Sequence, residues 1–260
     1  MLTFEQICEY FPKELIRINP KGILVEYLQY ELLDSIFKQP YSENLSFIGG
    51  TAIRMIYNSK RFSEDLDFDN FGLDFKGFKT LLSKACAEMR LKGFDLEYEF
   101  INRAPHYHCY LKFPKLLFEQ NISRHRSEKI LVSVDAEEKL KYKDPEVKLL
   151  NKFGIYRNLL VNPPDILLSQ KLLAILQKKR EKGRDFYDAS FLWGLTEPNL
   201  GYLEKRTNLS AETFKQKIIA RCEKLNYQSL AKDVEAFLFD EEQKLRVLNF
   251  LSLLKGKFKN

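Results

Sequence analysis

A glycine pair and two carboxylates are the residues whose types and spacing suggest chemistry in this chain. Gly49 and Gly50 follow a short apolar stretch, where glycine allows a sharp turn and a close approach to the backbone. A helix that begins near Thr51 would present free N–H groups and its positive dipole end, which suit a phosphate. Asp65 and Asp67 fall on one face of a predicted strand, and such oxygen ligands suit Mg²⁺. These features could bind a triphosphate and a metal ion, the basic requirement for nucleotide transfer.

The sequence around these residues resembles a known family. Residues 49–54 read GGTAIR and residues 61–68 read RFSEDLDF, a combination that resembles the AbiEii/AbiGii-type nucleotidyltransferase toxins of the DNA polymerase β-like superfamily. The glycine pair, helix and Asp-x-Asp strand are the superfamily's pattern, whereas residues 61–68 are closer to the toxins. Fourteen residues separate Gly50 from Asp65, which is longer than the minimal superfamily spacing. The resemblance covers about residues 45–195 of the chain.

The resemblance implies a nucleotidyltransferase that moves an NMP from an NTP to a hydroxyl and releases pyrophosphate. It implies Mg²⁺ or Mn²⁺ as cofactor, an antitoxin partner in a toxin–antitoxin or phage-defence system, and an RNA acceptor such as a tRNA 3′ end. The residues that it implies as catalytic are Asp65, Asp67, Asp135, Lys171 and Asp185. The implied metal ligands are Asp65, Asp67 and Asp135, and the implied nucleotide-binding residues are Gly49, Gly50, Thr51, Arg54, Ser63 and Lys171.

A third carboxylate would complete the metal site, and two residues compete for that role. Asp135 ends the apolar stretch 129–136, which reads KILVSVDA and predicts a strand. In the resembling superfamily the third acidic residue lies on a neighbouring strand, which favours Asp135. Asp69 shares a strand face with Asp65 and Asp67 but lies closer to the following loop, so it ranks second. Asp135 could alternatively have no functional role and be a charged residue at the point where the strand leaves the sheet.

Lys171 lies in an apolar stretch where a charge is costly. The residues three and four positions away from it are Leu167, Leu168, Ala174 and Ile175. Its ammonium must therefore find an anion or reach solvent, and a triphosphate would serve as that anion. The resembling family carries a functional lysine on the corresponding helix. Asp185 matches the family's last motif and could orient Lys171 or Arg184, or act as a base on the attacking hydroxyl. We expect Asp188 to be structural.

The elements that must position these residues divide the chain into two parts. We predict strands over 45–48, 63–68, 94–104, 106–113, 129–136, 147–153 and 157–161, and helices within 1–38, from about 51 and over 75–91. From Pro163 onward the pattern is helical, with helices over 164–181, 184–195, 199–207, 210–224, 227–239 and 241–255. The predicted fold is α+β. A nucleotidyltransferase domain over 1–160, a small mixed sheet backed by helices, precedes an α-helical domain over 161–260.

Composition bounds the class of protein. The 260 residues are 45% hydrophobic and 30% charged, which is typical of a globular chain that is not disordered. No apolar run is long enough to span a bilayer, so we expect no membrane partner and a cytoplasmic location. The four cysteines form no Cys-x-x-Cys pair, which argues against a zinc site or a disulfide framework. The net charge of +6 permits an anionic partner without requiring one.

The acceptor and the type of activity stay open at this stage. The basic run 178–184, KKREKGR, would continue the helix of Lys171 and favours an RNA acceptor. One alternative is a small-molecule nucleotidyltransferase of the antibiotic-modifying kind. Another is a nucleotide-binding regulator without turnover, which the intact Asp65, Asp67 and Lys171 argue against. The pair His106 and His108 has no third ligand nearby in sequence and receives no role.

Overall fold

The structure is a computed structural model that describes residues 1–259. The chain forms two compact units. Unit 1 comprises Met1–Tyr57 and Phe62–Val161, and unit 2 comprises Asn58–Arg61 and the chain from Asn162 onward. The chain therefore passes between the units three times, and the segment 58–61 leaves unit 1 in the middle of the motif region. None of the described helices has the length and apolar character needed to cross a lipid bilayer.

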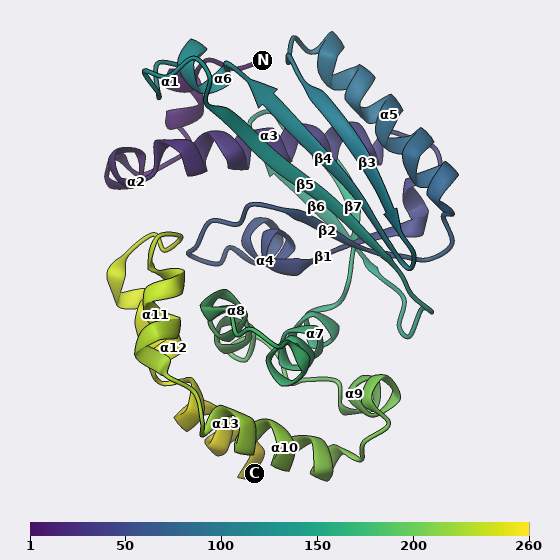
Figure 1. The fold of residues 1–260 in the computed structure, drawn as a ribbon, viewed down its shortest axis with the longest axis vertical. Helices are drawn as coiled ribbons and strands as arrows, with labels where there is room; N and C mark the ends of the chain where they lie inside the picture. The colour runs from purple at the N-terminus through teal and green to yellow at the C-terminus, as the bar shows by residue number, and fades with distance from the viewer. Residues whose placement is uncertain (260) are drawn as a thin grey trace. The chain divides into compact units, whose positions relative to one another are not determined.

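Unit 1 is built on a seven-stranded mixed sheet with the order β3-β4-β5-β2-β1-β7-β6 (Figure 1). The pairs β1–β7 and β2–β5 are parallel, and the other neighbours are antiparallel. The strands are β1 (Leu45–Ile48), β2 (Leu66–Asn70), β3 (Glu97–Arg103), β4 (His106–Pro114), β5 (Lys129–Glu138), β6 (Glu146–Lys152) and β7 (Ile155–Val161). A mixed sheet combined with helices confirms the predicted α+β class.

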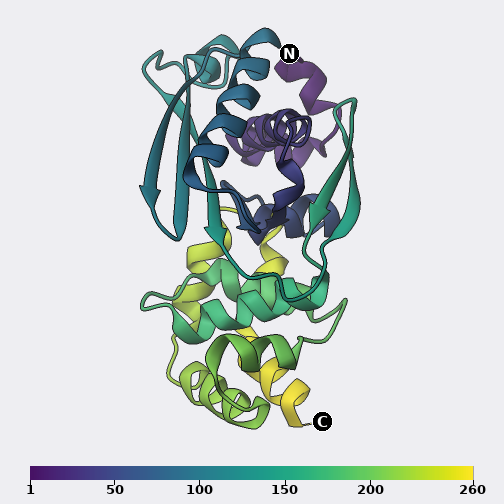
Figure 2. The ribbon, with the colours of Figure 1, turned by 90° about the vertical axis from the view of Figure 1, so that its right-hand side faces the viewer.

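One face of this sheet is apolar and is covered by two long helices, α3 (Pro20–Phe37) and α5 (Phe75–Leu91) (Figures 1 and 2). Alternate residues of β4 and β5 are buried, as a strand with one face toward a core requires. Phe78 of α5 fixes the packing, since its ring lies 5.7 Å from the ring of Tyr107 and 6.3 Å from that of Phe100. The smaller helices of unit 1 are α1 (Phe4–Cys8), α2 (Lys13–Ile18), η1 (Ser42–Asn44), α4 (Gly49–Tyr57) and α6 (Leu116–Glu119).

The start of β3 differs from the prediction. The strand begins at Glu97 rather than at Phe94, because Gly93 turns the chain with a φ of 92° after α5. Phe94 is then buried, and its ring packs 6.0 Å from Tyr27 and 6.4 Å from Phe113. The apolar residue that began the predicted alternation therefore belongs to the core, not to the strand.

Unit 2 is helical around an aromatic core. The ring of Phe250 lies 5.1 Å from that of Phe186 and 6.1 Å from that of Trp193. The helices are α7 (Pro164–Gln177), α8 (Gly183–Leu192), α9 (Leu200–Thr207), α10 (Ala211–Cys222), α11 (Tyr227–Glu235), η2 (Glu241–Lys244), α12 (Leu245–Leu248) and α13 (Phe250–Lys259). The single helix predicted over 241–255 is thus divided into three.

The helix predicted over 164–181 is too long. α7 ends at Gln177, and Lys178 is already extended with a ψ of 136°. The position of the next helix, α8, explains why α7 ends there. A Cβ on Gly183 would lie 1.9 Å from the carbonyl oxygen of Leu230, so α8 begins in direct backbone contact with α11. The chain has to turn to reach that contact, and residues 178–182 form a loop. The basic run therefore does not extend the helix of Lys171.

Candidate active site

The polar face of the sheet in unit 1 aligns four side chains in a row. Ile48 of β1 pairs with Asp67 of β2, Asp67 pairs with Asp135 of β5, and Asp135 pairs with His108 of β4. Neighbouring strands lie about 4.8 Å apart, so the two carboxylates are direct neighbours on one face. These four residues line a small cavity of about 120 Å³. The registry brings together two acids that are far apart in the sequence.

Asp135 is held by side chains on two strands. His108 Nδ1 lies 2.6 Å from Oδ1 of Asp135, and because a carboxylate accepts, Nδ1 is the donor. The Ser133 hydroxyl donates to Oδ2 at 2.8 Å. The ring of Tyr110 stacks parallel to the imidazole, with an interplanar angle of 6°. Each carboxylate oxygen keeps a further lone pair while its direction is fixed, which is how ligating carboxylates are usually supported.

Asp69, the alternative third carboxylate, lies in a different environment. Its side chain is buried and accepts from Lys139 Nζ at 2.7 Å. The same ammonium lies 3.0 Å from Glu137. Asp69 is therefore neutralised within the sheet, whereas Asp135 lies directly beside Asp67. This geometry favours Asp135 as the third carboxylate.

The turn between β1 and α4 presses against the carboxylate of Asp67. Gly49 has a φ of 77°, and a Cβ there would lie 2.2 Å from Oδ2 of Asp67. Only glycine allows this approach. Thr51 is fully buried, and its hydroxyl donates to the backbone carbonyl of Asp65, which immediately precedes β2. The glycine turn, the start of α4 and the Asp65–Asp67 segment thus form one locally fixed assembly.

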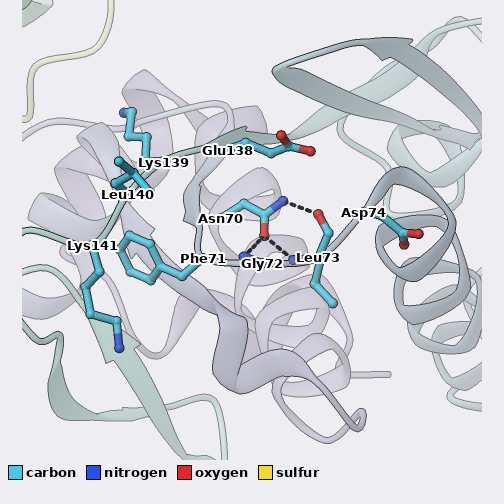
Figure 3. Close-up of a pocket in the computed structure, with 9 residues that line it drawn as sticks. All are labelled: Asn70, Phe71, Gly72, Leu73, Asp74, Glu138, Lys139, Leu140 and Lys141. Atoms are coloured by element: carbon cyan, nitrogen blue, oxygen red, sulfur yellow. Dashed lines mark hydrogen bonds between the residues drawn. The ribbon is translucent and has the colours of Figure 1, made fainter.

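The far end of β2 is fixed as well. The buried side chain of Asn70 donates to the carbonyl of Leu73 at 2.7 Å and accepts from the amides of Gly72 and Leu73, as Figure 3 shows. The loop that follows β2 is therefore a preformed turn rather than a free segment. It borders a hollow of about 620 Å³, where the Lys141 ammonium lies 5.6 Å from the ring of Phe71.

Two of the expected nucleotide-binding residues have partners inside unit 1. The Arg54 guanidinium is buried and forms two bonds with Glu26, of 2.9 and 3.2 Å. Lys152 also contacts Glu26, at 2.8 Å. The carbonyl of Ser63 accepts from the side chain of Gln29 at 3.0 Å. These contacts stabilise the region around the motif, and the nucleotide-binding roles of Arg54 and Ser63 stay predictions.

Lys171 finds its anions within unit 2. Its ammonium lies 3.1 Å from Asp185 and 2.8 Å from Asp188, whose carboxylates are both buried. Asp188 also forms two bonds of 2.7 and 2.6 Å with the guanidinium of Arg61, which is 1% exposed. Asp185 accepts in addition from Lys178 at 2.7 Å. Three cations therefore surround two carboxylates, and the cost of burying Lys171 is offset without a bound ligand.

The charged forms of this cluster are stabilised by their neighbours. Burial alone would lower the pKa of Lys171, but the carboxylates of Asp188 and Asp185 outweigh it and raise that pKa. Burial alone would raise the pKa of Asp185, yet the charges of Lys171 and Lys178 hold it well below its usual range. Arg61 and Lys171 likewise outweigh burial and lower the pKa of Asp188. All three groups are ionised at neutral pH.

The predicted metal ligands fit a divalent ion by the chemistry of their donor atoms. Asp65, Asp67 and Asp135 supply only oxygen donors, which Mg²⁺ and Mn²⁺ prefer. Asp67 and Asp135 are register partners, and the carboxylate of Asp67 lies directly against Gly49, where a Cβ would come within 2.2 Å of Oδ2. Within residues 1–259, no three His, Cys, Asp or Glu side chains already stand in ion-binding geometry. Side-chain rotation would therefore have to accompany binding.

Sequence reasoning missed His108. The alternation of β4 places His106 and His108 on one face, and this signal is visible in the sequence. The partner of His108 is Asp135, 27 residues further along, and only the register of β4 against β5 brings the two together. A search for a third ligand close in sequence could not find it.

Comparison with solved structures shows the same fold over nearly the whole chain. MenT4, a nucleotidyltransferase toxin from Mycobacterium tuberculosis, matches with a TM-score of 0.62 at 16% identity, covering 98% of this chain and 90% of that chain. JHP933 from Helicobacter pylori matches with a TM-score of 0.53 at 19% identity, covering 92% of this chain and 94% of that chain. No curated protein matches the sequence.

The family assignment comes from the sequence itself. Residues 31–259 match the family described as nucleotidyl transferase AbiEii toxin, type IV TA system. The match extends through both units and confirms the resemblance read from residues 49–54 and 61–68. The chain therefore belongs to the AbiEii family and is a nucleotidyltransferase of a toxin–antitoxin system.

Proposed function

We propose that this nucleotidyltransferase moves an NMP from an NTP to a hydroxyl of RNA, with the 3′ end of a tRNA as the acceptor, and that it requires Mg²⁺ or Mn²⁺. The observation that carries the proposal is the direct pairing of Asp67 with Asp135 beside the Gly49 turn. Phosphoryl transfer relies on positioning and charge stabilisation. This assembly would position a metal ion, and the charge of that ion would stabilise the transferred phosphoryl group.

In this proposal each residue of unit 1 has a distinct task. Asp65, Asp67 and Asp135 would hold the metal, which supplies charge neutralisation for the triphosphate when it is bound. His108 would keep the carboxylate of Asp135 directed toward that position, as its 2.6 Å contact suggests. The Gly49 turn would let the phosphates approach the backbone at the start of α4. Thr51 would act indirectly by holding Asp65, because its hydroxyl is already used there.

Lys171 and Asp185 are the proposed functional residues of unit 2. The Lys171 ammonium is 14% exposed and kept charged by its carboxylates, so it could contact a phosphate without first acquiring a proton. Asp185 would position Lys171 through the 3.1 Å contact, which is one of the roles its motif suggested. Glu26 already neutralises the buried guanidinium of Arg54, so Arg54 would support the fold around the turn and would not contact the phosphates.

The test is to incubate the protein with each α-labelled NTP, Mg²⁺ and total RNA, and to follow the label. We expect label in a tRNA-sized band, released by digestion from the 3′ end. Asp67→Asn and Asp135→Asn should abolish labelling while the far-UV circular dichroism is unchanged. Asp69→Asn should lower stability without removing the metal site. Label in a small molecule instead of RNA would favour the antibiotic-modifying alternative, and binding of NTP without turnover would favour the regulator.

The toxin–antitoxin family implies an antitoxin as a further partner. Co-expression of the chain with the gene of its cognate antitoxin should relieve growth inhibition by the wild type. The Asp67→Asn variant should not inhibit growth with or without that gene. Growth inhibition by Asp67→Asn equal to that of the wild type would separate toxicity from nucleotide transfer.

A further inference from the structure

A hollow on the surface of unit 2 is bordered by positive charge. It has a volume of about 690 Å³ and is lined by Glu181, Lys217, Ala220, Arg221, Lys224, Leu225 and Asn226. The spacing of residues 217, 220, 221 and 224 is that of a single helical face, so α10 and the turn after it form one wall. A second hollow of about 280 Å³ shares Glu181, Leu225 and Asn226 with the first and adds Arg180. We call this continuous surface the basic hollow.

The opposite wall is the loop 178–182, and it is fixed to α10. Arg221 donates to the carbonyl of Lys178 and, at 2.8 Å, to the carboxylate of Glu181. This contact joins segments about 40 residues apart and holds the loop against the helix. It also neutralises Glu181, and the nearby Asp233 accepts from the amide of Gly183 at 2.8 Å. The acids that border the hollow are thus already engaged.

The cations around the hollow are not engaged in the same way. Within residues 1–259, the ion pairs of the structure include none formed by Arg180, Lys217 and Lys224, which line the two hollows. The same holds for Lys179 and Lys182, which line neither hollow but are exposed in the same loop as Arg180. By contrast, Lys178 in the same loop pairs with Asp185. Several unpaired like charges around a concave surface raise the local potential and attract an anion.

The side chains that line the two hollows also indicate which kind of anion the surface can bind. Among the described residues 1–259, no aromatic side chain lines either hollow, so these residues offer no platform on which bases could stack. Lysine and arginine without such a platform contact phosphates, which supplies affinity and orientation but no base specificity. A polyanion with regularly spaced phosphates can engage several of the five cations at once, which a single phosphate cannot.

We propose that the basic hollow binds the phosphate backbone of the acceptor RNA, independently of its sequence. The proposal rests on the proposed function, which supplies RNA as the partner. It differs from the sequence-based expectation in its geometry, because the loop 178–182 acts together with α10 rather than as an extension of α7.

The test is the double variant Lys217→Gln/Lys224→Gln, with unfractionated deacylated tRNA as the probe. Both side chains are exposed, so the fold should not change. We expect weaker tRNA binding and a shallower plot of log K against log salt concentration. Two lost contacts should reduce the slope by about 1.8 for duplex RNA or about 1.4 for a single strand. NTP affinity in the absence of tRNA should equal that of the wild type.

The matched control is Lys76→Gln/Lys84→Gln, which removes the same charge from exposed positions on α5. It should leave the salt slope unchanged, which excludes an effect of net charge alone. A slope for the hollow variant equal to that of the wild type would overturn the proposal while leaving RNA as the acceptor. Wild type that neither binds nor labels tRNA would overturn the proposed function as well. Loss of binding to phosphatidylserine vesicles, with tRNA binding retained, would reassign the surface to a membrane.

Discussion

Replacement of Lys171 by methionine should destabilise unit 2. The sequence alone suggests the opposite, since methionine removes a charge from an apolar stripe at similar volume. In the structure, however, the lysine ammonium contacts two carboxylates of which 8% and 0% is exposed. Methionine would leave both carboxylates buried with one cation fewer, and buried charges without partners are costly.

The size of the effect follows from the partners that remain. Removing one member of a buried ion pair costs about 3–5 kcal/mol. Asp188 keeps its two bonds to Arg61, and Asp185 keeps Lys178, so we expect the lower end, about 3 kcal/mol. The matched control is Lys178→Met, which contacts the same Asp185 but is 45% exposed. Exposed pairs contribute about 0–1 kcal/mol, and the control should lose no more than that.

Urea unfolding followed by tryptophan fluorescence would measure both variants. The chain has a single tryptophan, Trp193, which is buried in unit 2, so the signal reports on that unit. The midpoint should fall strongly for Lys171→Met and little for Lys178→Met, with an unchanged slope. A Lys171→Met midpoint at or above that of the wild type would refute the argument that the carboxylates stabilise the buried lysine. NTP affinity, measured on the same samples, tests the separate proposal of a phosphate contact.

The pKa shifts in this cluster determine how its contribution to the free energy of unfolding changes with pH. The pKa values of Asp185 and Asp188 are lowered in the folded state, so their stabilisation is complete above about pH 4 and is lost as the pH falls. The pKa of Lys171 is raised, so its contribution is present below about pH 10 and is lost only at higher pH. The cluster should therefore contribute a constant stability between these limits. Lys171→Met should unfold at a higher pH than the wild type during acid titration, because the depression of both carboxyl pKa values becomes smaller.

Three further predictions address the two units separately. Gly49→Ala should lower the thermal midpoint and abolish transfer, because the backbone at this position has a φ of 77°, which alanine rarely adopts, and the added Cβ would lie 2.2 Å from Oδ2 of Asp67; an alanine variant with wild-type activity would contradict the close approach. His108→Leu should weaken Mn²⁺ binding, measured by electron paramagnetic resonance, by about 10–100-fold, and His108→Asn should restore most of it because its amide can donate as Nδ1 does. His106→Leu is the control for both His108 variants. If His108→Leu, His108→Asn and His106→Leu bind Mn²⁺ with equal affinity, His108 does not belong to the site. A chain of residues 162–260 should fail to fold cooperatively, because it lacks Arg61 and leaves Asp188 buried with half its partners; a sharp urea transition from Trp193 would oppose this.

Local patterns in the sequence predicted most of the elements. The helix at 75–91 and the strand at 45–48 have the predicted bounds, since amphipathic periodicity and flanking turn residues determine them locally. The end of α7 could not be predicted in this way. It depends on the contact between Gly183 and the backbone at Leu230, which is 47 positions away in the sequence. Long-range contacts of this kind override local helix preference.

The same distinction between local patterns and long-range contacts applies to the candidate site. The sequence indicates Asp65 and Asp67 directly, because the motif and the strand parity are both local. Strand order and register are not local, and they decide which other residues join the site. Asp135 and Asp69 are equivalent by residue type, but only the pairing of β2 with β5 sets Asp135 beside Asp67, while Lys139 neutralises Asp69. The parity of β4 could suggest His108, but not its partner.

Arg61 illustrates how a motif residue can serve a different purpose from its neighbours. It lies four residues before Asp65 in the stretch that resembles the family, and by position it belongs with the segment that carries Asp65 and Asp67. Yet it is part of unit 2, where its buried guanidinium completes the partners of Asp188 and its backbone forms a bridge with Leu238. The chain leaves and re-enters unit 1 on either side of 58–61, so the core of unit 2 is covalently continuous with α4 and with the segment that carries Asp65 and Asp67. A single stretch of sequence can therefore carry residues with different tasks, and its resemblance to the family reflects the structure of unit 2 as well as the chemistry proposed for Asp65 and Asp67.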